Sequence, residues 1–581
     1  MAKKLVIAFA PLVVVLFLFT SMLTDPPHAA SIDHSSAFGR LVDRYFDLNF
    51  QFHPSDGTAA GVHQYDSKLE DYSRAAQEGE AAKLKVVLSE LAGTKASALD
   101  PADAADCAFL QSTIRSRLLE LQVIQMWRKD PNIYAGGVTS SVFTLIKRNF
   151  ASPEDRLRSV IAREKQIPAA LIVGRQNLLN PPRIYTEIAL EQMPDIIEFF
   201  QKDVPGAFSA VTDPTLREQF SETNEAVIEA LGSFQTYLKN DLLSKSHGDF
   251  RIGAENFRQK LRDDEMVDVP LDRLLEIGYA DLRRNQQRLQ ETAALVNPEE
   301  KSRAVMTELE KDHPPADGLL PAFRDLLAGL RDFIEARQIV TIPSPVVPIL
   351  EETPPFMRAT TSASMDTPGA YESRATEAMF NVTLPEPGWP AERVEDWMRG
   401  YNRGTILSTA IHETYPGHYV QFLWLQRLHS KVRKLLVCNS NAEGWAHYTE
   451  QMMLDEGYGG GDPKLRMGQL QDALLRDARF IVGIQMHTGR MTLDEAKQFF
   501  VREGYQVDSI AEIEAKRGTS DPTYLYYTLG KLQIMKLRDD YKKKMGAQYS
   551  LREFHDRLMG QGGLPLVLIR RALLGDNSPS L

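Results

Sequence analysis

Apolar residues recur at spacings of three and four along most of the chain, and this period limits the fold more than any other feature. The pattern runs from about residue 36 to 340, as in FGRLVDRYFDL at 38–48 and LDRLLEIGYADLRRNQQRL at 271–289. Such spacing gathers apolar side chains on one face of an α-helix. With 581 residues, of which 43% are apolar, the chain can bury a large core. The sequence therefore predicts a mainly α-helical protein.

Prolines interrupt the helical pattern between residues 341 and 390. Proline ends helices because it lacks an amide hydrogen and clashes with the preceding turn. The stretch AYESRATEAMFNVTL at 370–384 has β-branched and aromatic residues between turn signals, which indicates one or two short strands. We therefore expect a helical lobe at 31–340, an extended segment at 341–390 and a second helical lobe at 391–581. The interrupting prolines are Pro343, Pro345, Pro348, Pro354 and Pro355.

The first 30 residues are typical of a targeting segment. Lys3 and Lys4 precede an apolar run from Leu5 to Leu23, and small residues follow near Ala30. This order predicts a secretory signal peptide. The run is long for a signal, so an uncleaved anchor in the inner membrane is the alternative. In both cases the body of the protein is expected to be exported, to the periplasm or beyond.

Charge and cysteine content exclude some classes of protein. The net charge is −11 and the pI about 5.7, which argues against a nucleic-acid partner because phosphate binding needs basic surfaces. The two cysteines, Cys107 and Cys438, are too few for a disulfide scaffold. Neither lies near the apolar run, which argues against lipoprotein processing. The sequence does not indicate an oligomeric state.

One short stretch carries an irregular metal-binding motif. IHETYPGHYVQ, residues 411–421, begins like H-E-x-x-H, in which two histidines one helical turn apart hold zinc. Pro416 occupies the place of the second histidine, and His418 comes two residues later. On a regular helix His418 would point about 240° away from His412. A bulge at Pro416 and Gly417 would turn it back, whereas a chance His-Glu pair beside a helix break is the alternative.

A second stretch, NAEGWAHYTEQ at 441–451, offers a third ligand. Glu443, His447 and Glu450 lie at i, i+4 and i+7, on one face of a helix. A hydrolytic zinc takes three protein ligands and keeps one position for water. Glu443 is the predicted third ligand, with His447 as its rival. Glu450 is predicted to hold a ligating histidine in place from behind.

HETYPGHYVQ followed by EGWAHYTEQM resembles the exported bacterial family called domain of unknown function 885. That family has the pattern H-E-x-x-P-G-H and then E-G-W-A-x-Y, and it is usually grouped with zinc metallopeptidases of the gluzincin type. Thermostable carboxypeptidases and neurolysin-like peptidases are more distant comparisons. YLYYTLGKLQIMKLR at 524–538, EFHDRLMGQGGLPL at 553–566 and GDFRIGAENFRQKLR at 248–262 are similar to further family segments. The resemblance thus covers about residues 40–575.

The resemblance implies His412, His418 and Glu443 as ligands of Zn²⁺. It implies Glu413 as the general base that takes a proton from the attacking water and passes it to the leaving amine. It further implies two helical lobes that flank a deep cleft, with the small sheet beside the site.

Other residues of the resembling segments have candidate roles in catalysis. Tyr527 falls on the family's tyrosine before x-x-G and could donate a hydrogen bond to the oxyanion. Tyr524 and Tyr526 are its rivals, and Tyr526 is otherwise a substrate-binding candidate. His487 is a second candidate for the oxyanion role, and Arg538 for binding a substrate carboxylate.

These observations predict an exported zinc peptidase that acts on peptides or oligopeptides. A helical protein that binds peptides, with an inactive or absent metal site, is the alternative. A di-iron bundle needs two Glu-x-x-His pairs, and only Glu310 with His313 fits, beside Pro314. A serine hydrolase is disfavoured because the G-x-S-x-G motif is absent. The sequence does not indicate whether ends or internal bonds would be cut.

Overall fold

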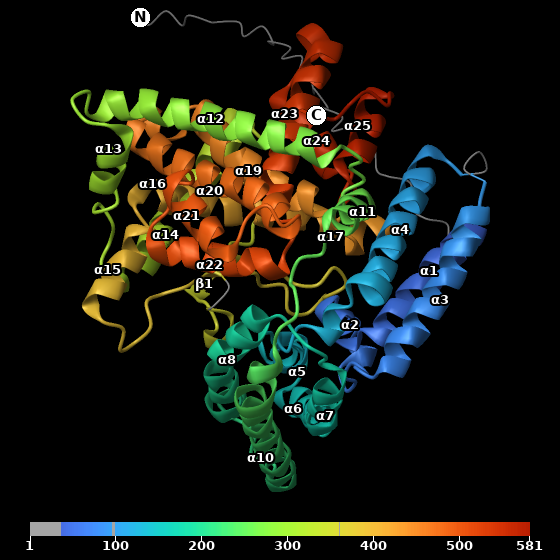
Figure 1. Cartoon of the computed structure of the whole chain (residues 1–581). Coiled ribbons are helices and arrows are strands. Elements are labelled where there is room, and N and C mark those ends of the chain that lie inside the picture. The colour runs from blue at the N-terminus through green and yellow to red at the C-terminus, as the bar shows by residue number, and fades with distance from the viewer. Residues whose placement is uncertain (1–35, 96–98, 359–360) are drawn as a thin grey trace, which may run out of the picture.

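The computed structural model describes residues 36–95, 99–358 and 361–581 (Figure 1). These residues form many α-helices and one small sheet, which confirms the predicted mainly α class. The signal or anchor predicted within residues 1–30 lies outside the described residues. Across the described ranges, no helix combines the length and the apolar character needed to cross a membrane.

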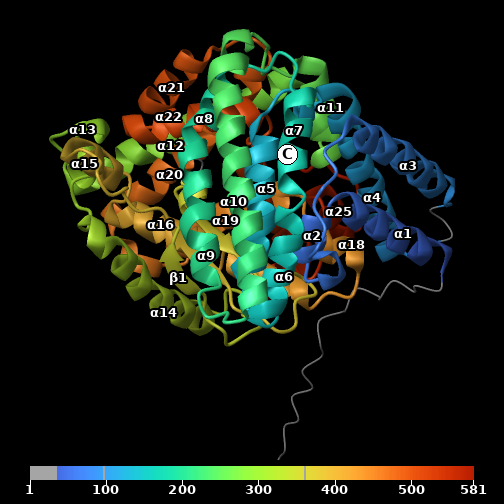
Figure 2. The ribbon, with the colours of Figure 1, turned by 90° about the horizontal axis from the view of Figure 1, so that it is seen from below.

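Nine of the first ten helices form two groups, and α2 packs against α1 of one group and α5 of the other (Figure 1). Helices α1, α3 and α4 pack side by side on one flank of the molecule, drawn in blue. Helices α5 to α10 lie below the body, and the long α10 packs along α6, α7 and α8 (Figure 2). Their bounds are α1 Ala37–Phe52, α2 Pro54–Ala59, α3 Arg74–Gly93, α4 Pro101–Leu119, α5 Asn132–Ile146, α6 Pro153–Glu164, α7 Ile167–Asn177, α8 Arg183–Glu198, α9 Val204–Ala207 and α10 Pro214–Tyr237.

The next four helices lead the chain back over the C-terminal part. Helix α12 lies along α20 (Pro463–His487), and their apolar faces share one core, in which Leu282 and Ile481 are buried. Helices from both sides of residue 340 therefore pack together. The lobe boundaries expected at residues 340 and 390 remain predictions. The bounds are α11 Ala254–Asp264, α12 Leu271–Val296, α13 Ser302–Leu309 and α14 Leu319–Arg337.

A three-stranded sheet occupies the proline-rich segment. Its strands are β1 (Ile349–Glu352), β2 (Ala363–Asp366) and β3 (Met379–Val382), in the order β1-β3-β2. Strand β1 runs parallel to the buried β3, and β2 antiparallel to it. The expectation of one or two strands is therefore too low. The edge strands are four residues long and lack a buried face, so no alternation of apolar and polar residues marks them in the sequence.

Helices resume at Ala391, where the sequence predicted them to resume, and continue to Leu574. The bounds are α15 Ala391–Arg399, α16 Arg403–Glu413, α17 His418–Gln426, α18 Lys431–Leu435, α19 Asn439–Asp455, α20 Pro463–His487, α21 Leu493–Arg502, α22 Asp508–Ser520, α23 Tyr526–Met545, α24 Leu551–Met559 and α25 Leu566–Leu574. Helices α16, α19, α20 and α23 pack on one another and hold the candidate site between them.

Helices α19 and α23 approach each other closely at a pair of glycines. A Cβ atom built on Gly444 would lie 2.4 Å from the Cα of Gly530, and one on Gly530 would lie 1.8 Å from the backbone oxygen of Ser440. These glycines belong to the E-G-W and Y-x-x-G segments. Both motifs therefore contain a residue that lets two site-bearing helices touch.

Gly444→Ala is expected to destabilise the fold, because the added methyl group meets backbone atoms that have no room to move. Overpacking of this kind costs about 1–3 kcal/mol. Gly79→Ala in α3 is the matched control: a Cβ there meets nothing within 4 Å, and alanine in a helix is favoured by about 0.5–1 kcal/mol over glycine. Chemical denaturation of both variants tests this, and equal stability changes would contradict the close-packing account.

Candidate metal centre

A tight turn brings the two histidines of the irregular motif together. Helix α16 ends at Glu413 and α17 begins at His418, so the helix is fully interrupted rather than bulged as expected. The amide of Gly417 donates to the backbone oxygen of Ile411 at 3.0 Å. A Cβ on Gly417 would lie 1.8 Å from the backbone oxygen of His412. Only glycine can approach the end of α16 this closely.

The tryptophan of the E-G-W motif holds this turn. The indole Nε1 of Trp445 donates to the backbone oxygen of Pro416 at 2.8 Å, and the Trp445 side chain is fully buried. The two motifs are therefore linked by a direct contact. The same helix that carries Glu443 fixes the turn that places His418.

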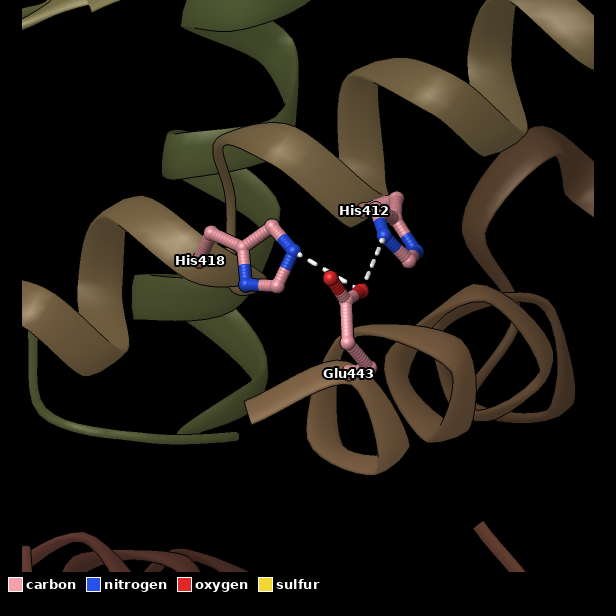
Figure 3. A group of neighbouring side chains, drawn as sticks. All are labelled: His412, His418 and Glu443. Carbon is pink, nitrogen blue, oxygen red and sulfur yellow. Dashed lines mark hydrogen bonds and ion pairs between the residues drawn. The ribbon is translucent and has the colours of Figure 1, made fainter. Parts of the chain in front are cut away.

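His412, His418 and Glu443 converge on one point (Figure 3). Oxygen Oε2 of Glu443 lies 3.2 Å from Nε2 of His412 and 3.2 Å from Nε2 of His418. One donor atom from each residue lies within 4.8 Å of the other two. Tetrahedral ligands at 2.0–2.2 Å from zinc are roughly 3.3–3.6 Å apart. The two 3.2 Å distances to Glu443 are close to this value, and the His/His/Glu donor set suits Zn²⁺.

The side chains around His412 stabilise positive charge on its imidazole. Burial alone would lower the pKa of the His412 imidazole, but its hydrogen bonds to Glu443 and Glu450 raise the pKa to about 9. The Glu443 side chain keeps 22% of its exposure, so the group remains open on one side. Among the described residues, this is the one group of three or more His, Cys, Asp or Glu side chains that could hold a metal ion.

Glu450 supports the group from behind, as the sequence predicted for its position. One carboxylate oxygen accepts from Nδ1 of His412 at 2.7 Å and pairs with Nη2 of Arg476 at 2.9 Å. The other oxygen lies 3.1 Å from Nδ1 of His447. Burial would raise the pKa of Glu450, but Arg476 and His447 lower it, so the carboxylate stays charged. With Nδ1 bound to Glu450, His412 presents Nε2 toward Glu443.

His447 is not part of the converging group, although it was the rival ligand. It lies one turn past Glu443 on α19 and points its Nδ1 at Glu450. The side chain is fully buried, and burial lowers the pKa of the imidazole to about 3. It is therefore a neutral partner of Glu450, one layer behind the histidine that faces the site.

Glu450→Gln is expected to weaken zinc binding by roughly 10- to 100-fold, the usual loss when a carboxylate behind a ligating histidine is removed. Glutamine has one accepting oxygen and an NH2 donor, so it cannot accept from both His412 and His447 as the two carboxylate oxygens of Glu450 do. Chelator-competition titration of the folded variant measures this change. Circular dichroism separates it from loss of fold, and an unchanged zinc affinity would remove Glu450 from the site.

Glu413 lies at the wall of a cavity next to the metal group. The cavity has about 110 Å³ of free volume, and His412 and Tyr527 also line it. The Glu413 residue is only 7% exposed. Its carboxylate forms no hydrogen bond or ion pair with another described residue, unlike those of Glu443 and Glu450. An enclosed carboxylate without a protein partner is costly unless water or a ligand meets it in the cavity.

Tyr527 is the tyrosine that reaches this cavity. Its ring stacks near that of His412, with centroids 6.1 Å apart and planes 23° apart. The hydroxyl accepts from Nη2 of Arg517 at 3.1 Å, and burial raises the pKa of the phenol. Tyr526 instead donates to Asp521 at 2.8 Å and does not line the cavity.

Three other candidates lie outside the cavity. Tyr524 is fully buried and packs against glycines of α20 and α22 as a core residue. His487 is also fully buried: one ring nitrogen accepts from the amide of Ile252 and the other donates to the backbone oxygen of Gly518. Both nitrogens have backbone partners, so His487 has no free donor for an oxyanion. The structure therefore does not support the predicted role of His487 in binding the oxyanion.

Arg538 also lies too far from the cavity for its predicted role of binding a substrate carboxylate. It lies on α23 eleven residues after Tyr527, about 16 Å along the helix. Its Nη1 donates to the hydroxyl of Tyr448 at 3.2 Å, and Tyr448 in turn contacts His555 at 2.9 Å. Arg538 therefore supports a buried aromatic cluster rather than a substrate.

Three arginines that surround Tyr527 were not among the site residues predicted from the sequence. Arg476, Arg479 and Arg517 line the cavity, and their guanidinium carbons lie 4.6–5.8 Å from the Tyr527 ring centroid. A signal was present: Asp472, Arg476 and Arg479 fall at i, i+4 and i+7 in α20, a helix that is otherwise mostly buried. Charges on a buried face need partners, which points to a polar site.

Comparison with known proteins places this arrangement in a family. The family model of bacterial proteins of unknown function called DUF885 matches residues 54–573. The chain belongs to the DUF885 family. The match includes every residue of the metal group and of the cavity, so the candidate site is part of the DUF885 domain itself.

Two solved structures share the DUF885 protein's fold. One is a proposed lipoprotein of unknown function from Shewanella oneidensis, with 26% identity and a TM-score of 0.76 over 93% of this chain and 100% of that one. The other is a proposed lipoprotein from Colwellia psychrerythraea, with 17% identity and a TM-score of 0.79 over 93% and 99% of the two chains. No curated protein matches the chain.

Proposed function

We propose that this DUF885 protein is a zinc-dependent peptidase that hydrolyses peptides or oligopeptides. The observation that carries the proposal is the convergence of His412, His418 and Glu443 beside a cavity that Glu413 faces. Two imidazoles and one carboxylate form a donor set that hydrolytic zinc sites use, with one coordination position left open. An enclosed, unpaired carboxylate next to that set is what general-base catalysis requires.

The roles of the chain's own residues follow from their positions. A bound Zn²⁺ would supply Lewis acidity for water and for the scissile carbonyl. Glu413 takes the proton of the attacking water and passes it to the leaving amine. Because the Tyr527 hydroxyl accepts from Arg517, its own hydrogen is available for the carbonyl oxygen as negative charge develops there. Glu450 keeps His412 oriented.

The sheet offers a place for an extended substrate. Strand β2 pairs with β3 only, and in the described chain no strand pairs with its other edge. Ser362 and Ala363, at the start of β2, line the same cavity as Glu413. An extended peptide can bind along such an edge through backbone hydrogen bonds. This arrangement favours a peptide over a compact small molecule as the substrate.

We also propose that the protein is exported and associated with the cell envelope. The basic start and the apolar run Leu5 to Leu23 support export, and so does the likeness to the proposed lipoprotein from Shewanella oneidensis. Cys107 and Cys438 are both buried in the fold, so neither is available to carry a lipid. Cell fractionation with N-terminal sequencing of the mature chain tests this.

Digestion of a mixed peptide library, with and without a chelator, tests the proposed activity. Mass spectrometry of the products is expected to show cuts that the chelator abolishes and that added Zn²⁺ restores. Peptides that are bound but never cut by the zinc-loaded protein would instead support a binding protein. Cuts that survive full removal of metal would contradict the zinc mechanism.

A further inference from the structure

Two arginines on neighbouring helices line the cavity that contains His412 and Glu413. Arg479 comes from α20 and Arg517 from α22. Arg479 is 7% exposed, and the Arg517 side chain is 25% exposed. Neither contacts the metal group, and the peptidase mechanism above uses Arg517 only as a support for Tyr527. The proposed mechanism therefore gives no role to Arg479 and only a supporting role to Arg517.

Two of the three guanidinium nitrogens of Arg479 bind a carboxylate of the protein. Nε and Nη2 each donate to a different oxygen of Glu514, both at 2.6 Å. Burial alone would raise the pKa of Glu514, but Arg479 together with Arg517 and Arg476 lowers it, so the carboxylate stays charged and the pair stays fixed. The third nitrogen, Nη1, forms no hydrogen bond with a described residue, and the Arg479 side chain lines the cavity.

Arg517 is held in a similar way. Its Nη2 donates to the hydroxyl of Tyr527 at 3.1 Å, to that of Tyr526 at 3.3 Å and to Asp521 at 3.2 Å. Nη1 of Arg517 likewise forms no hydrogen bond within the described ranges, and the side chain lines the cavity. Each guanidinium is thus anchored at one end and has a donor group available at the other.

Arg476, the third arginine of the cavity, has protein partners on both terminal nitrogens, and its unpaired Nε is buried out of reach of a ligand. Its Nη2 pairs with Glu450 at 2.9 Å and its Nη1 donates to the backbone oxygen of Asp472 at 3.0 Å. It serves the carboxylate that orients His412. The contrast singles out Arg479 and Arg517 as the arginines with donors available to a ligand.

We propose that Arg479 and Arg517 bind a carboxylate of the substrate, and this rests on the proposed peptidase function. A guanidinium presents planar N–H donors that match a carboxylate, and anchoring at one end leaves little side-chain entropy to lose on binding. The carboxylate is either the C-terminus of the peptide or an acidic side chain near the cut. Leu475, Ile510 and Ile513 also line the cavity, and their aliphatic side chains suit the uncharged part of the bound residue.

The distances within the site limit how far the hydrolysed peptide bond can lie from the bound carboxylate. The guanidinium carbon of Arg479 lies 4.6 Å from the Tyr527 ring centroid, and the His412 ring lies 6.1 Å from the same centroid. At 3.3–3.6 Å per extended residue, the anchored carboxylate is within about three residues of His412. The protein is therefore expected to release short C-terminal products, or to cut beside Asp or Glu.

Matched peptides test the proposal. One peptide with neutral side chains is prepared with a free C-terminus and with a C-terminal amide, and a third carries Glu near an amidated end. The free acid, or the Glu peptide, is expected to exceed the neutral amide in kcat/KM by roughly tenfold to a hundredfold, the value of a charged hydrogen bond. The preferred peptide identifies the source of the carboxylate. Equal kcat/KM for all three peptides overturns the carboxylate site but leaves the peptidase proposal standing.

A binding measurement keeps the test independent of turnover. Calorimetric titration of the same three peptides is expected to give tighter binding of the carboxylate-bearing peptide even if no peptide is cut. Hydrolysis of none of them by the zinc-loaded protein would contradict the peptidase proposal alone. Equal affinities for all three would contradict the carboxylate site.

Substitution at Arg517 locates the site. Arg517→Gln is expected to raise KM for the carboxylate peptide by at least about tenfold and to erase its preference over the amide. Arg517→Lys keeps the charge without the planar donors and is expected to restore only part of the preference. Arg217→Gln, an exposed position on α10, is the control. A mere loss of support for Tyr527 would slow both peptides alike, so an unchanged acid-to-amide ratio in Arg517→Gln overturns the assignment.

Discussion

Glu413→Gln is expected to lower kcat/KM for peptide hydrolysis by roughly 100- to 10,000-fold, the usual contribution of a general base. The amide fits the same space at the cavity wall but cannot accept the proton of the attacking water. Because Glu413 is not one of the converging donors, the variant should bind one zinc ion as the unaltered protein does. Steady-state kinetics with a cleavable peptide, together with metal analysis, measures both effects.

The control for this variant is Glu222→Gln, an exposed position on α10, which should leave kinetics and metal content unchanged. Full turnover in Glu413→Gln would show that another group acts as the base. Loss of zinc along with activity would show instead that Glu413 belongs to the ligand set. The two failures are distinguishable because activity and metal are measured on the same sample.

His418→Ala is expected to weaken zinc binding by more than about 100-fold, because removal of a direct ligand costs more than the 10- to 100-fold lost when a supporting residue is removed. His418 supplies one of three donor atoms, and its Nε2 lies 3.2 Å from Glu443. The fold should survive because the methyl group of alanine fits the first turn of α17. Chelator-competition titration and peptide hydrolysis should both report the loss.

His247→Ala provides the matched control, since His247 is exposed on a loop between α10 and α11. Zinc affinity in that variant should equal that of the unaltered protein. If His418→Ala kept a full equivalent of tightly held zinc, the metal would have to lie elsewhere. His447 would then be the first residue to examine, since its Nε2 is buried without a hydrogen bond to a described residue.

The helical class and several helix ends could be predicted because local chemistry determines them. Ser152 caps α6 with Pro153 in its first turn, and Thr492 and Glu495 form a reciprocal capping box at α21. At α24 the side chain of Ser550 accepts from the amide of Glu553. The third strand was missed because a four-residue edge strand without a buried face leaves no periodic signal.

The relative positions of candidate site residues could be predicted where the residues lie close in sequence or share a motif. His412, His418 and Glu443 were predicted to converge, and the structure brings their donor atoms together. The role of Gly417 was expected to be a helix bulge, whereas it permits a sharp turn between two helices. The sequence could not distinguish these because both need the same backbone freedom.

Residues distant from the motifs were placed less well. His487 and Arg538 have suitable chemistry for the roles predicted, but tertiary packing points them into other parts of the fold. The reverse holds for Arg479 and Arg517, which come from different helices and meet only through their shared contact with Tyr527. No spacing in the sequence links two side chains on separate helices.

The central claim is that His412, His418 and Glu443 hold one zinc ion. Anomalous diffraction recorded on both sides of the zinc absorption edge, from crystals of the zinc-loaded protein, tests this claim most directly. The account predicts a single strong peak at about 2.0–2.2 Å from a nitrogen of each histidine and from a carboxylate oxygen of Glu443. A peak that leaves His418 or Glu443 without a bond to the metal, or no peak at this place, would contradict it.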